Sequence, residues 1–172
     1  MIAQISLTPT ESKKFIAKAI SQMDIVKRAV AHGTIVLHPS SSTYFLAKEL
    51  LGHSPPTNTW TCGVIAPKGA CVDIGAATAR GGHAEGAADT GGPGAFRHDY
   101  VIRQGSFATG IPMDELLAKM GPGDVFVKGV NALDPQGGVA VLIGNTVEGG
   151  TIGRVLAAFR KKGFGLIFPV GL

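Results

Sequence analysis

Four hydroxyl residues in a row follow a short apolar run in the first third of the chain. The run is Thr34–His38, Pro39 comes next, and the hydroxyl residues are Ser40, Ser41, Ser42 and Thr43. Where a buried strand meets a helix, backbone N–H groups and the helix dipole attract a negatively charged group. The pattern therefore predicts a cradle for an anion, with all four hydroxyl residues as ligand contacts. The alternative is a plain turn in which Ser42 or Thr43 only caps the helix.

A second polar cluster lies in the segment GVNALDPQGGVAVLIGN, residues 129–145. Asn131 and Asp134 follow an apolar strand, the chain turns through a proline and two glycines, and a second apolar strand ends near Asn145. We predict that this segment shares one crevice with the hydroxyl run, because ligands collect at the carboxyl ends of parallel strands. The alternative is that Asn131 and Asp134 only bond to the backbone of their own turns. The predicted ligand contacts are Lys128, Gly129, Asn131, Gly137, Gly138 and Asn145.

Residues 75–97 consist almost wholly of glycine, alanine and polar residues, which predicts a long mobile loop. Such a loop can fold over a ligand, with Arg80 or Arg97 placed to meet a phosphate or carboxylate. His83 and Glu85 match the H-x-E element of zinc deaminases, but no P-C-x-x-C element follows them. We therefore predict no metal site and no cofactor.

The elements that must position these residues alternate between helices and strands. A capping box at Thr8 and Glu11 opens one long predicted helix, which ends on Gly33 as a left-handed stop. The alternation favours an α/β fold: a single layered, Rossmann-like domain, residues 1–172, with a mostly parallel sheet flanked by helices. Strands are predicted at 34–38, 60–66, 70–74, 99–103, 125–128, 139–143 and 166–170, and further helices at 44–51, 113–120 and 152–162.

Composition restricts the class of partner. The 172 residues are 45% apolar and 16% charged, with a net charge of +4, which suits a globular protein that attracts anionic metabolites. The basic stretches Lys13–Arg28 and Arg160–Lys162 are interpreted as solvated helix faces rather than a nucleic-acid surface. Cys62 and Cys71 match no zinc or redox spacing, and no apolar run reaches the length of a membrane span. We expect a cytoplasmic protein with no membrane partner.

The segments GTIVLHPSSSTYFLAKEL and VFVKGVNALDPQGGVAVLIGN resemble a known superfamily over most of the chain. It includes ribose-5-phosphate isomerase, glucosamine-6-phosphate deaminase, the CoA transferases and the sugar-sensing domains of deoxyribose-operon repressors. The resemblance implies that Ser40–Thr43 form the phosphate or acyl-group loop. Gly129-Val130-Asn131 stands where the family has Gly-Ala-Asp, so an amide replaces the family's carboxylate. An amide forms hydrogen bonds but takes up no proton near neutral pH.

The resemblance implies binding of a small anionic metabolite, either a phosphorylated sugar or a CoA thioester. An isomerase-like or CoA-transferase-like enzyme would use Asp134 as a base or Glu148 as a nucleophile. The alternative is a non-catalytic sensor or regulatory subunit that acts through the contacts of a homodimer or larger oligomer. The missing Gly-Ala-Asp carboxylate favours the sensor, whereas a loop that excludes water favours the enzyme.

Overall fold

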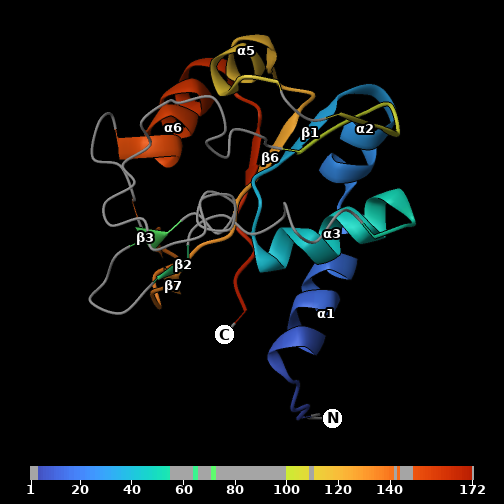
Figure 1. The fold of residues 1–172 in the computed structure, drawn as a ribbon, viewed down its shortest axis with the longest axis vertical. Coiled ribbons are helices and arrows are strands. Elements are labelled where there is room, and N and C mark those ends of the chain that lie inside the picture. The colour runs from blue at the N-terminus through green and yellow to red at the C-terminus, as the bar shows by residue number, and fades with distance from the viewer. Residues whose placement is uncertain are drawn as a thin grey trace, which may run out of the picture.

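The computed structural model describes residues 4–54, 64–65, 71–72, 100–108, 111–141, 143 and 149–171 (Figure 1). The described helices are α1 (Pro9–Gln22), α2 (Asp24–His32), α3 (Ser41–Leu51), α5 (Met113–Lys119) and α6 (Gly150–Lys162). The five strands of the largest sheet are β1 (Thr34–Leu37), β4 (Tyr100–Arg103), β5 (Ser106–Ala108), β6 (Val125–Val127) and β9 (Gly165–Ile167). Two short hairpins are β2 (Val64–Ile65) with β3 (Cys71–Val72), and β7 (Ala132–Leu133) with β8 (Val139–Ala140).

The largest sheet is mixed, and the chain is therefore a mixed α/β protein. Its strand order is β5-β4-β1-β6-β9. The strands β1, β6 and β9 run parallel, as the sequence predicts, whereas β4 and β5 are antiparallel to their neighbours. The sequence did not predict β5, which returns along β4 after a tight turn at Gln104 and Gly105, both with positive φ.

Alternation along the central strands divides the apolar core into two clusters. In β1, Ile35 and Leu37 join the cluster that contains residues of α1, α2 and α3, whereas Val36 joins the cluster of α5 and α6. In β6, Phe126 belongs to the same cluster as Val36. Neighbouring strand residues point to opposite faces, so the two clusters lie on opposite faces of the sheet. Helices therefore cover both faces, as Figure 1 shows.

The predicted first helix is two helices. Its start is confirmed, because the Thr8 hydroxyl accepts the Glu11 N–H and the Glu11 carboxylate accepts the Thr8 N–H. These bonds from Thr8 also lower the pKa of Glu11. The uninterrupted course to Gly33 is wrong, because Met23 has an extended backbone with ψ of 135°. The break turns α2 relative to α1, so that buried residues of both helices reach one cluster.

The predicted strand 139–143 is also wrong in length and position. Among its described residues, 139–141 and 143, only Val139 and Ala140 are in a strand, and they pair with Ala132 and Leu133 rather than with the largest sheet. A turn at Pro135 and Gln136 folds the chain back at once. Residues 131–140 are therefore exposed throughout, and this hairpin, which we call the β7–β8 ribbon, forms a sheet of its own.

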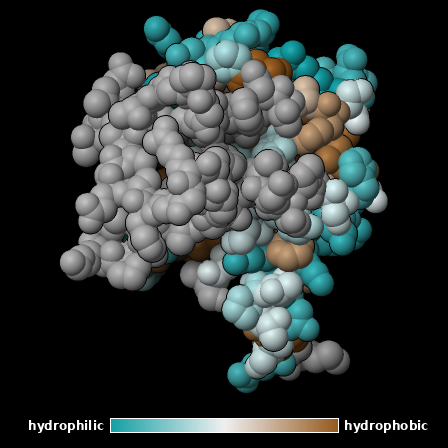
Figure 2. All heavy atoms as spheres, in the orientation of Figure 1, coloured by the Kyte–Doolittle hydropathy of each residue, from teal (hydrophilic) through white to brown (hydrophobic). Residues whose placement is uncertain are grey.

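Helix α1 reaches furthest from the sheet. Its amino-terminal half projects beyond the other elements (Figure 1). The surface of this half that is seen in Figure 2 is mainly hydrophilic. Among the described helices, none has both the length and the apolar character that a bilayer crossing requires.

A close backbone contact aligns the amino ends of β1 and β6. The Asp124 carboxylate accepts the N–H of Thr34 at 2.7 Å and the N–H of Gly121 at 2.8 Å. A side chain on Gly33 would collide with the carbonyl of Gly123. The φ of Gly33 is −124°, so the predicted left-handed stop is wrong. Glycine is needed here because two backbone segments touch.

We expect Gly33→Ala to lower the free energy of unfolding by about 1–3 kcal/mol, because its methyl group would push β1 away from the Gly123 carbonyl. Urea denaturation followed by circular dichroism measures the change. Gly123→Ala is the matched control, since a Cβ there meets nothing within 4 Å. Equal stability of the two variants would show that the contact does not constrain the strands.

Candidate functional site

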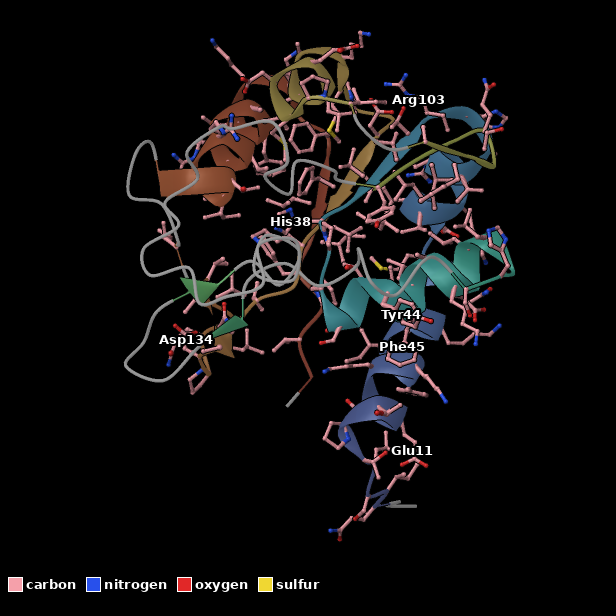
Figure 3. All side chains as sticks on the ribbon, in the orientation of Figure 1. Glu11, His38, Tyr44, Phe45, Arg103 and Asp134 are labelled. Carbon is pink, nitrogen blue, oxygen red and sulfur yellow. The ribbon has the colours of Figure 1, made fainter. Side chains whose placement is uncertain are left out.

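The carboxyl ends of the three parallel strands meet at one edge of the sheet. The N–H of His38, just after β1, donates to the carbonyl of Val127 at 2.9 Å. The N–H of Lys128, just after β6, donates to the carbonyl of Ile167 at 3.1 Å. The hydroxyl run and the start of the second polar segment therefore leave the sheet side by side, beyond the position of His38 in Figure 3.

Two of the four hydroxyl residues have structural bonds. Ser40 is the N-cap of α3, and its Oγ accepts the N–H of Thr43 at 3.2 Å. The prediction that Ser42 or Thr43 caps this helix is wrong, because the helix begins one residue after Ser40. Thr43 is fully buried and its Oγ1 donates to the carbonyl of His38 at 2.7 Å. These bonds fix the path of the turn between β1 and α3.

Ser41 contacts a residue that the sequence did not assign to the site. The Nζ of Lys13, on α1, donates to the Oγ of Ser41 at 2.8 Å. Ser41 is exposed in the first turn of α3, where the N–H groups lack acceptors within the helix. Lys13 was assigned to a solvated basic stretch, since it lies 28 positions before Ser41 and no spacing rule joins them.

Gly129 brings the second segment against the hydroxyl run. A Cβ on Gly129 would lie 3.0 Å from the Oγ of Ser40, so the backbone of Gly129 packs directly against the Ser40 side chain. Lys128 and Gly129 are half-buried, and Asn131 is exposed at the base of the β7–β8 ribbon. The structure thus places Lys128, Gly129 and the hydroxyl run at one edge, as the sequence predicts.

The bonds of Asp134 lie within its own turn. Its Oδ1 accepts the N–H groups of Gln136 at 2.9 Å and Gly138 at 2.7 Å. Gly137 has a φ of +84°, and a side chain on Gly138 would strike the Asp134 carboxylate. The alternative, in which Asp134 bonds to the backbone of its own turn, therefore explains why Gly137 and Gly138 are glycines. Figure 3 shows Asp134 on the β7–β8 ribbon, apart from His38.

Several predicted features lie outside the described residues. They are Glu148, Asn145, the loop 75–97 with His83, Glu85, Arg80 and Arg97, and Cys62. Within the described ranges, no group of three or more His, Cys, Asp or Glu side chains is arranged to hold a metal ion.

A small cavity lies at the opposite edge of the sheet. Its volume is about 30 Å³, enough for one water molecule. It adjoins the amino ends of β1 and β6, so it is separate from the hydroxyl run. Nearby, a hydrogen bond from Lys119 lowers the pKa of Glu115. The cavity is lined by Thr34, Arg103, Leu116, Lys119, Met120 and Asp124.

Comparison with known proteins gives no match for this chain among family models, curated proteins or solved structures. The resemblance to the sugar-phosphate isomerase and CoA-transferase superfamily stays a prediction.

We expect Ser40→Ala to lower the free energy of unfolding by about 1 kcal/mol, because the N–H of Thr43 loses its acceptor. Thermal unfolding measures the change. Ser41→Ala is the control, since the exposed Ser41 hydroxyl bonds only to Lys13 among the residues that the structure describes. If both variants melt together, Ser40 does not stabilise α3 as a cap.

Proposed function

We propose that the chain binds a small anionic metabolite at the carboxyl ends of β1, β6 and β9, against the amino end of α3. The observation that carries the proposal is the position of the Lys13 ammonium group, 2.8 Å from Ser41. The amino end of a helix bears a partial positive charge, which disfavours a cation there. A bound anion would offset both charges and accept bonds from the Ser41 hydroxyl and from the first-turn N–H groups other than that of Thr43, which donates to Ser40.

The surrounding residues support an anionic ligand at this edge of the sheet. Lys128 leaves β6 at the same edge, and Gly129 lets the chain pass close to Ser40. The parallel strands covered by helices on both faces support a Rossmann-like layered architecture, in which ligands bind at this edge. The proposed ligand classes are a phosphorylated sugar and a CoA thioester, as the resemblance implies.

The proposed role is binding without catalysis by Asp134. The Asp134 carboxylate is exposed and holds two backbone N–H groups of its own turn, so its bonds are those of a structural residue. A sensor or regulatory subunit that reports its ligand through an oligomer fits this arrangement. The competing proposal is an isomerase-like or transferase-like enzyme in which Asp134 or Glu148 reacts.

We expect a bound anionic metabolite to raise the melting temperature by several degrees at about 100 times Kd, and Lys13→Met or Ser41→Ala to reduce the rise. The measurement is a thermal-shift titration with inorganic phosphate, ribose 5-phosphate and coenzyme A. Lys27→Met is the matched control, because it removes one exposed positive charge from α2. If the ligand raises the melting temperature of Lys13→Met and Lys27→Met equally, the anion does not bind beside Lys13.

Asp134→Asn separates the structural role of this residue from a catalytic one. An asparagine oxygen can accept the same two backbone bonds, so we expect Asp134→Asn to melt with the wild type and Asp134→Ala to melt lower. Melting curves test the structural role of Asp134, and turnover assays with any identified substrate test a catalytic role. Loss of turnover in a normally stable Asp134→Asn variant would show that Asp134 acts as a base.

A further inference from the structure

The β7–β8 ribbon is held together by its own bonds. The Asp134 N–H donates to the Gly138 carbonyl at 2.9 Å, and the Gly137 N–H donates to the Asp134 carbonyl at 3.1 Å. At the base, the Asn131 N–H donates to the Ala140 carbonyl at 2.9 Å. With the two bonds to the Asp134 carboxylate, these contacts make the ribbon a defined unit outside the largest sheet.

One face of the ribbon carries a pair of apolar side chains. Leu133 and Val139 are directly opposite each other in the antiparallel pairing, so they share a face. They are 40% and 39% exposed, so each has apolar surface left to cover. Two-stranded hairpins are marginally stable alone, and further apolar burial stabilises them.

The ribbon is joined to the chain beside the proposed anion site. Gly129, against Ser40, precedes the ribbon base at Asn131. Leu133 follows Gly129 by four positions, so it lies at most about 14 Å from it. A metabolite with its anionic group at α3 can therefore extend its uncharged part to the apolar pair. Asp134 follows Leu133 directly, in the turn of the ribbon.

We propose that Leu133 and Val139 bind the organic part of the metabolite and so determine which anions the site prefers. This inference rests on the proposed function, in which α3 and Lys13 bind the anionic group. The ribbon distinguishes a phosphorylated organic ligand from free phosphate, because only the former has apolar or ring surface to cover the pair.

The test compares two ligands on the full chain. Isothermal titration gives Kd for inorganic phosphate and for coenzyme A in the wild type and in the double variant Leu133→Ser, Val139→Ser. We expect Kd for coenzyme A to rise about tenfold and Kd for phosphate to change less than twofold. Met23→Ser is the matched control, since Met23 is 42% exposed at the junction of α1 and α2; it should change neither value.

A second measurement separates the two proposals. In hydrogen exchange of the wild type, phosphate should protect the first-turn amides of α3, whereas coenzyme A should also protect residues 131–140. Protection of α3 by both ligands without protection of the ribbon would overturn the specificity role and leave the anion site standing. If neither ligand protects α3, the proposed function fails and the inference fails with it.

Discussion

The arrangement of the candidate site depends on one short polar contact far from it. The Asp124 carboxylate bonds to the N–H of Thr34 and the N–H of Gly121, and Gly33 lets the two backbones touch. This contact sets the register in which Ile35 lies opposite Val125. Because the strands are short, the same register fixes where they end, and so places Ser40 against Gly129 at the other edge of the sheet.

Local signals predicted the fold well where they act over a few residues. The capping box at Thr8 and the apolar run of β1 both have close counterparts in the structure. The periodicity of apolar residues did not predict the break at Met23. Both α1 and α2 bury apolar residues in the same cluster, so the helical pattern continues across the break. Periodicity also failed at Val139, where apolar character suggested burial and a four-residue turn prevented it.

The candidate site could be predicted only in part. A parallel strand followed by a helix identifies its edge from sequence, so Ser40 and Gly129 were found. The contribution of Lys13 could not be predicted from the sequence. It depends on how α1 packs across α3, and that packing has no local sequence signal. The role of Asp134 was left open between a ligand contact and a turn, since both use the same residue type.

The central position of β1 has a consequence for how the chain folds. Its hydrogen-bonded neighbours, β4 and β6, both come from the second half of the sequence, and the bond between Thr34 and Asp124 spans 90 positions. During synthesis, β1 therefore emerges long before either neighbour exists. Its apolar residues and both its edges stay open until then, so we expect this long-range pairing to be the slow step of folding. We expect the nascent chain to be most prone to aggregation in that interval, because α1, α2 and α3 can shield only one face of β1.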